Sequence, residues 1–141
     1  MSNPLVPITV AVTVNAPIAT AWAAFTEPKH MTQWNFAIPE WHCPRAENDL
    51  RTGGTFIARM EARDGSMGFD FGGVYTDVQH HRVIAYTMGD GRTVRVEFAA
   101  SGNTTTVTET FDPETINPRE RQQGGWQSIL DNYKKHAESI R

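Results

Sequence analysis

Two side chains in this sequence could carry acid–base chemistry, and the first is Glu109. In the segment Thr104–Phe111 it shares the alternation of Val107 and Phe111, so a strand here would turn a carboxylate toward its apolar face. A buried carboxylate without a partner is costly, so Glu109 would have to be paired, protonated or solvated inside a pocket. The alternative is that Glu109 lies at the rim of a sheet, or that a bulge reverses the alternation.

The second candidate is His42, which lies between Trp41 and Cys43. An imidazole titrates near neutral pH, which suits general acid–base catalysis or the orientation of a ligand at the mouth of a cavity. A histidine in a loop can equally be an exposed side chain without such a role. No second pair of ligating residues accompanies His42 and Cys43 at metal-ligand spacing, so we predict no metal site and no cofactor. The motif Gly-x-Ser-x-Gly is absent, so nothing indicates a serine nucleophile.

A larger set of aromatic and apolar side chains falls on strand faces, helix faces or connections that could point inward. Ligand pockets are mostly apolar and aromatic with a few placed polar groups, although the same side chains could form a packed core. We favour a pocket, with two tryptophans at its entrance and Glu109 and His42 as its polar contacts. The predicted lining is Trp34, Trp41, His42, Phe56, Met60, Phe69, Phe71, Tyr86, Glu109, Trp126, Leu130 and Tyr133.

Alternating apolar and polar residues predict a meander of short strands joined by tight turns. Gly72-Gly73 indicates a bulge or bend in one of these strands. The predicted strands are Ile8–Val14, Thr55–Ala62, a strand containing Phe69 and Phe71, Val83–Met88, 93–99 and Thr104–Phe111.

Helices are predicted at two places, after the first strand and at the end of the chain. An apolar face from Ile18 to Phe25 indicates a short helix, with Asn15 as its cap and Pro17 in its first turn. A helical turn over 29–33 follows.

A long helix over 119–140 then comes after the strands, and it must bury an apolar stripe against their sheet. Its Gly124-Gly125 pair costs roughly 1 kcal/mol per residue relative to alanine. We therefore expect either a bend in this helix or a space beneath it, and a space would make the fold a container.

Three motifs carry a family resemblance: residues 50–56 (LRTGGTF), 60–65 (MEARDG) and 125–130 (GWQSIL). With these, the chain from Val6 to its end resembles the helix-grip proteins of the START/Bet v 1-like superfamily, the polyketide cyclase and lipid-transport type. Within it, the chain is similar to the bacterial group resembling the C-terminal domain of the activator of heat-shock-protein-90 ATPase.

The resemblance implies an α+β helix-grip fold, with a curved antiparallel sheet wrapped around a long C-terminal helix and two short helices after the first strand. It also implies a hydrophobic small molecule held between helix and sheet. A minority of the superfamily are enzymes such as cyclases. The chaperone-partner role belongs to proteins with a further N-terminal domain, so we rank a chaperone-interacting module last.

Composition excludes several other classes of protein. With 13 basic and 16 acidic residues the net charge is −3, which predicts no nucleic-acid partner. No apolar stretch approaches the ~18 residues that a membrane helix needs, so no membrane insertion is predicted. Residues 1–5 lack the features of a signal peptide, and the lone Cys43 excludes an internal disulfide, so we expect a cytoplasmic location.

The length of 141 residues predicts a single domain over 1–141, as a monomer or homodimer. The leading functional hypothesis is binding of a hydrophobic small molecule. The first alternative is a cavity enzyme, of cyclase, dehydratase or hydrolase type, that uses Glu109 or His42 as its acid or base.

Overall fold

The structure, a computed structural model, describes residues 6–140 of the chain. The N-terminal residues that we predicted to lack a signal peptide lie outside this range. The elements in chain order are β1 (Ile8–Val14), α1 (Ile18–Thr26), α2 (Pro28–Trp34), β2 (Trp41–Asn48), β3 (Thr55–Ala62), β4 (Gly68–Gln79), β5 (Val83–Met88), β6 (Thr93–Ser101), β7 (Thr104–Phe111) and α3 (Arg119–Ser139).

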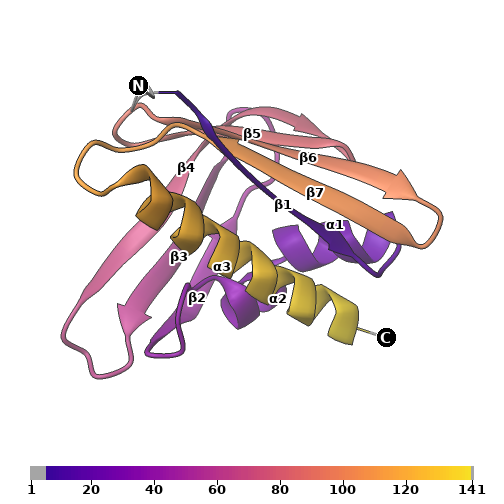
Figure 1. The fold of residues 1–141 in the computed structure, drawn as a ribbon. Helices are drawn as coiled ribbons and strands as arrows, with labels where there is room; N and C mark the ends of the chain where they lie inside the picture. The colour runs from indigo at the N-terminus through magenta and orange to yellow at the C-terminus, as the bar shows by residue number, and fades with distance from the viewer. Residues whose placement is uncertain (1–5, 141) are drawn as a thin grey trace.

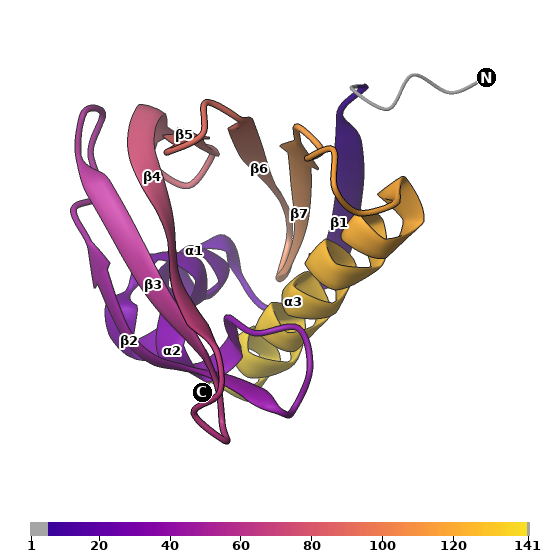
Figure 2. The ribbon, with the colours of Figure 1, turned by 90° about the vertical axis from the view of Figure 1, so that its left-hand side faces the viewer.

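The strands form a seven-stranded antiparallel sheet in the order β1-β7-β6-β5-β4-β3-β2. Every pair of neighbours except β1 and β7 is also consecutive in the chain, as expected for a meander. Figure 1 shows α3 lying across the concave face, and Figure 2 shows the sheet curling from β1, beside α3, round to β3 and β2. The predicted α+β helix-grip architecture is therefore confirmed.

Helices α1 and α2 connect the two edge strands and cover one end of the concave face (Figure 2). The predicted cap of α1 is wrong, because Pro17 occupies the N-cap position and no side chain caps the helix. The backbone N–H of Asn15 instead donates to Glu138 Oε2 at 2.7 Å, which ties the start of α1 to the end of α3. Helix α2 is fixed against α1 by Trp34, whose indole N–H donates to the carbonyl of Ala24 at 2.8 Å.

Two details of the strands differ from the prediction. Strand β2 begins at Trp41, inside what we expected to be a connection. The bulge in β4 lies between Tyr75 and Asp77, whereas Gly72 and Gly73 pair in regular register with β3. These glycines allow the backbone of β4 to lie close to its neighbouring strands. A Cβ at Gly73 would lie 2.5 Å from the Thr87 carbonyl oxygen on β5, and one at Gly72 would overlap the carbonyl of Phe56 on β3.

Helix α3 buries Leu130, Tyr133 and Ala137 in its C-terminal half. The Tyr133 hydroxyl donates to the carbonyl of Ala21 at 2.6 Å, so this half is anchored to α1. In the N-terminal half, no atom outside the helix backbone lies within 4 Å of an added Cβ at Gly124 or Gly125. Open space therefore surrounds both positions, and crowding by neighbours does not explain the two glycines.

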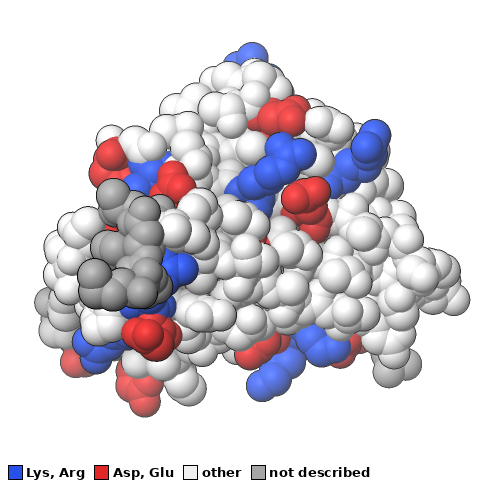
Figure 3. All heavy atoms as spheres, turned by 45° about the horizontal axis from the view of Figure 1, so that its top comes forward, with Lys and Arg blue, Asp and Glu red and all other residues white. Residues whose placement is uncertain are grey.

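The surface seen in Figure 3 carries positive and negative side chains interspersed among uncharged ones. Among the described residues, Arg95 lies 3.6 Å from Glu97 and Arg92 lies 2.7 Å from Asp90. Exposed ion pairs of this kind contribute little to stability. No field of one sign extends over this face.

Candidate functional site

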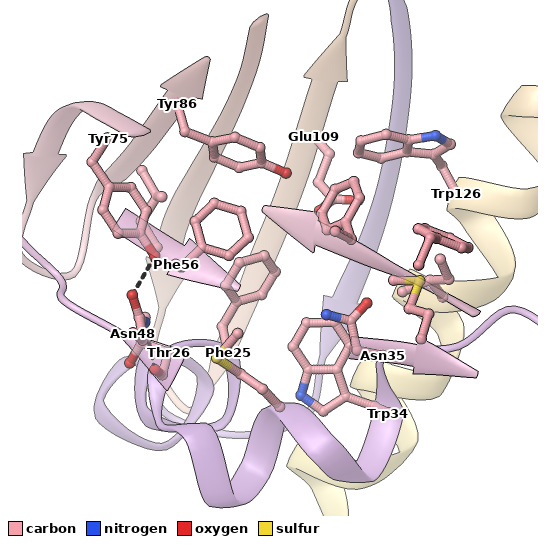
Figure 4. Close-up of a pocket in the computed structure, with 16 residues that line it drawn as sticks. Phe25, Thr26, Trp34, Asn35, Asn48, Phe56, Tyr75, Tyr86, Glu109 and Trp126 are labelled. Atoms are coloured by element: carbon pink, nitrogen blue, oxygen red, sulfur yellow. Dashed lines mark hydrogen bonds between the residues drawn. The ribbon is translucent and has the colours of Figure 1, made fainter. Parts of the chain in front are cut away.

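A cavity of about 190 Å³ lies between the concave face of the sheet and the helices (Figure 4). Most of its wall is aromatic or aliphatic, and side chains come from α1, α2 and α3 and from the five strands β2, β3, β4, β5 and β7. The lining residues are Phe25, Thr26, Met31, Trp34, Asn35, Asn48, Phe56, Met60, Phe69, Phe71, Tyr75, Ile84, Tyr86, Glu109, Trp126 and Ile129.

Aromatic rings in edge-to-face contact form one side of the cavity. Phe56 packs at an angle of 78° against Tyr86, with 4.7 Å between ring centroids, and Phe71 packs edge-on against Tyr86 and Trp126. Edge-to-face pairs place the positive ring edge on the negative ring face and stabilise the arrangement beyond the area that they bury. The wall is therefore held in shape by its own contacts.

The mouth of the cavity lies where lining residues keep contact with solvent. Phe69 on β4 is 48% exposed, and Trp126 and Ile129 on α3 are half-buried. Trp41 packs beside Phe69, with ring centroids 5.9 Å apart. The solvent-exposed part of the lining thus lies on β4, near the β3–β4 hairpin, and on α3.

One group of polar lining residues is already hydrogen-bonded within the protein. The Tyr75 hydroxyl donates to Asn48 Oδ1 at 2.5 Å, and Asn48 Nδ2 donates to the Thr26 carbonyl at 2.7 Å. The Thr26 hydroxyl in turn donates to the Trp22 carbonyl at 2.8 Å. This chain joins β4, β2 and α1 and leaves little hydrogen-bonding capacity for a ligand at that end.

Glu109 differs from that group because it has no hydrogen-bond or ion-pair partner among residues 6–140. The alternation predicted for Thr104–Phe111 is observed, and Glu109 is 7% exposed on the concave face. Within the described chain, every fully enclosed side-chain nitrogen or oxygen has a hydrogen-bond partner, so the Glu109 carboxyl must face the open space of the cavity. Burial raises its pKa from 4.5 to about 8, because desolvation disfavours the charged form.

Tyr86 and Asn35 are two further polar residues whose side chains make no hydrogen bond within the described part of the chain. They are 6% and 5% exposed, respectively, and both line the cavity. In Figure 4 the Tyr86 hydroxyl points toward the Glu109 side chain. Burial, with smaller contributions from Glu109 and Tyr75, raises the pKa of Tyr86 well above its ordinary value, so the phenol keeps its proton.

Four residues of the predicted lining lie outside the cavity wall. Leu130 and Tyr133 are fully buried in the core, and Trp41 lies beside the mouth. His42 pairs in register with Glu61 on the convex face, where its Nε2 lies 3.9 Å from Glu61 Oε1. The other predicted positions, from Trp34 to Trp126, do come together around one space, while their role in binding stays a prediction.

The neighbouring Cys43 is buried, and its thiol donates to the carbonyl of Arg45 at 3.5 Å. Desolvation raises the pKa of this thiol, so it stays protonated at neutral pH. A thiol in this state is a poor nucleophile.

Eight lining residues were missed by the sequence interpretation. Ile84 shares the alternation of Tyr86 and Phe25 lies on the predicted apolar helix face, so a pattern existed that could have found both. Asn35 and Asn48 gave no such signal, because an asparagine in a connection or an edge strand is ordinary. The remaining four are Thr26, Met31, Tyr75 and Ile129.

Across residues 6–140, no group of three or more His, Cys, Asp or Glu side chains is arranged to hold a metal ion. None of the helices described is long and apolar enough to cross a bilayer.

Residues 15–138 match the family model "Activator of Hsp90 ATPase homolog 1-like protein". The solution structure of an AHSA1-like protein from Aeromonas hydrophila is similar, with 40% identity and a TM-score of 0.85, covering 94% of this chain and 93% of that one. A protein from Cytophaga hutchinsonii is 52% identical, with a TM-score of 0.81 and coverage of 96% and 93%.

A crystal structure from Nitrosomonas europaea, at 19% identity and a TM-score of 0.83, shares the fold over 100% of this chain and 99% of that one. No curated protein matches significantly. The family match covers most of the sequence, and the relatives from Aeromonas and Cytophaga align over nearly their whole length. The chain therefore belongs to the family of Activator of Hsp90 ATPase homolog 1-like proteins, which have the START/Bet v 1-like fold.

Proposed function

We propose that this protein binds a hydrophobic small molecule in the cavity between α3 and the concave sheet. The observation that carries the proposal is an open space of about 190 Å³ with a largely aromatic wall, inside a fold whose relatives typically bind ligands. Removing apolar surface from water contributes ~25 cal/mol per Å², which would supply most of the affinity.

The size of the cavity limits the ligand. An engineered cavity of about 150 Å³ in another protein stays dry and binds benzene. A space of about 190 Å³ would accept one substituted aromatic ring, or an aliphatic molecule of similar bulk. Longer molecules would have to extend past Phe69 into the mouth.

Native mass spectrometry of the gently purified protein tests this proposal, followed by denaturation to identify any released mass. We expect a discrete small molecule at one equivalent per chain. A clean apo mass, combined with no binding of single-ring aromatic probes by NMR, would contradict the proposal and favour a packed core without ligand.

A second candidate, an enzyme acting in the same cavity, is favoured by the unpartnered carboxyl of Glu109. A carboxylic acid with a pKa of about 8 is protonated at neutral pH and could act as a general acid in cyclisation, dehydration or hydrolysis. His42 faces away from the cavity, so Glu109 alone would supply this chemistry.

Released masses from the wild-type protein and Glu109→Gln distinguish the two candidates. An enzyme would release product from the wild type and unconverted substrate from the variant. A binding protein would release the same molecule from both.

A further inference from the structure

We propose that Glu109 and Tyr86 act together as two hydrogen-bond donors that hold the carbonyl oxygen of an uncharged, single-ring aromatic ligand. This proposal rests on the proposed function, because it names the ligand class that the same cavity would select.

The sheet register brings the two side chains to one place. Tyr86 on β5 is paired with Val94 on β6, and Glu109 on β7 is paired with Val96 on the same strand. Both residues therefore lie on the concave face, with only β6 between their strands and an offset of two residues along it. Two strand spacings amount to about 10 Å between the backbones of β5 and β7. The side chains of Tyr86 and Glu109 are long enough to shorten the distance between their polar groups.

The close-up in Figure 4 shows the Tyr86 hydroxyl directed across the cavity toward Glu109. Neither group has a hydrogen-bond partner among residues 6–140, although both residues are more than nine-tenths buried. A buried polar group without a partner costs free energy. A ligand atom that accepts from both groups would remove that cost.

The charges that line the cavity determine which ligand atom can accept hydrogen bonds from Glu109 and Tyr86. Glu109 is the sole Asp, Glu, Lys or Arg in the cavity lining of the described chain, so no cation is available to a bound carboxylate. Burial keeps the Glu109 carboxyl protonated, and the Tyr86 phenol also keeps its proton. Two O–H donors then converge, and a carbonyl oxygen has two lone pairs with which to accept them.

This arrangement has a known chemical logic. A tyrosine paired with a carboxylic acid that an apolar site keeps neutral can bind an oxygen on which negative charge develops. The same two groups here would therefore prefer ketones and aldehydes over hydrocarbons, and would reject carboxylates.

An aromatic amine is the competing ligand. An ammonium group would pair with ionised Glu109 and contact the faces of the surrounding rings. The two ligands differ in their pH dependence, because the ketone requires protonated Glu109 and the ammonium requires the ionised form.

Four probes of similar size separate these possibilities: acetophenone, cumene, 1-phenylethylamine and benzoate. Each is titrated into the ¹⁵N-labelled protein and followed by backbone NMR shifts, at pH about 6.5 and about 9, on either side of the pKa of Glu109. At the lower pH we expect acetophenone to bind about tenfold or more tightly than cumene, since two hydrogen bonds are added. Its affinity should fall at the higher pH, and benzoate should not bind.

Variants assign the effect to the two residues. Tyr86→Phe and Glu109→Leu should each lower the preference for acetophenone over cumene by about fivefold. Glu109→Gln should remove the pH dependence, and it keeps the proposal testable if the leucine variant does not fold. Glu97→Gln, on the exposed face of β6, is the matched control and should behave as wild type.

Each contrary result has its own meaning. Equal binding of cumene and acetophenone by the wild type would overturn the donor pair and leave the container intact. Tighter binding of 1-phenylethylamine at pH about 9 than of acetophenone at pH about 6.5 would also overturn it and assign an ammonium site. Failure of all four probes, cumene included, would contradict the proposed function itself.

Discussion

The indole of Trp126 stacks on the ring of Phe111, with 4.0 Å between ring centroids and 10° between ring planes. Phe111 belongs to the core and is 1% exposed, whereas Trp126 also lines the cavity. Because Phe111 is fixed in the sheet, the stack holds the indole of Trp126 on α3 in one orientation. It fixes one wall of the space in which a ligand would lie.

Replacing Trp126 by alanine should therefore weaken ligand binding more than it weakens the fold. The change removes the stack and one cavity wall, but Trp126 is half-buried, so we expect a loss of unfolding free energy near the lower end of the ~3–5 kcal/mol range for buried tryptophans. Urea unfolding and an acetophenone titration measure the two effects. Trp22→Phe, in the core outside the cavity, is the control and should lower stability without changing affinity. Equal losses of stability and affinity in Trp126→Ala would contradict this separation.

Glu109 should make the wild-type protein less stable as the pH rises. Its pKa is 4.5 in the unfolded chain and about 8 in the folded one, so between these values the folded state holds a proton that the unfolded state has released. Unfolding free energy then falls by about 1.4 kcal/mol per pH unit across this window, up to a total on the order of 5 kcal/mol, and levels off above it.

The measurement is urea unfolding of wild type and Glu109→Gln from pH about 4 to about 9. The unfolding free energy of Glu109→Gln should increase relative to that of the wild type as the pH rises through this window. Glu97→Gln, whose carboxyl is exposed, should follow the wild type throughout. Parallel curves for all three proteins would show that the Glu109 carboxyl is not desolvated.

Gly124→Ala should stabilise the protein. A methyl group there meets no neighbour within 4 Å, and alanine is favoured over glycine in a helix by up to ~1 kcal/mol. A higher melting temperature by a few degrees is the expected result. A lower one would show that α3 needs the glycine for a conformation other than the straight helix.

The contact between His30 on α2 and His136 on α3 should weaken in acid. Their ring nitrogens Nδ1 and Nε2 lie 2.9 Å apart, which requires one donor and one neutral acceptor. Burial and, to a smaller extent, His30 lower the pKa of His136, so the unfolded chain takes up a proton first and stability is lost as the pH falls below about 6.5. NMR titration of the histidine rings should show a depressed pKa for His136. His136→Gln should flatten the acid side of the stability curve, whereas His80→Gln at an exposed turn should not.

Period-two alternation and one long apolar helical stripe predicted most of the strands and helices, whereas their helix-grip arrangement was implied by the family resemblance. The same alternation placed Glu109 on the concave face, since seven residue pairs with β1 hold β7 in register without a bulge. The start of β2 could not be predicted from alternation. The register shifts between His42 and Arg45, and the strand begins among aromatic residues. Alternation from buried Cys43 would have turned His42 outward, but no strand was expected there.

The polar side of the cavity was harder to predict for a physical reason. Asn35 ends α2 and Asn48 ends β2, and nothing in the sequence determines where a side chain at the end of an element points. Such positions depend on how distant segments pack. The predicted cap of α1 was wrong for the same reason. The backbone N–H of Asn15 donates a hydrogen bond to Glu138, more than a hundred positions away in the sequence.

The two halves of α3 make contacts of different kinds. Around Tyr133 the helix is tied to α1 by a buried hydrogen bond, whereas around Trp126 and Ile129 it borders the cavity. The residues that secure the helix are thus different from those that would meet a ligand. Substitutions can accumulate in the N-terminal half, at the cavity, without loss of the folded state. Descendants of one ancestral chain can therefore diverge in what they bind while inheriting the same architecture.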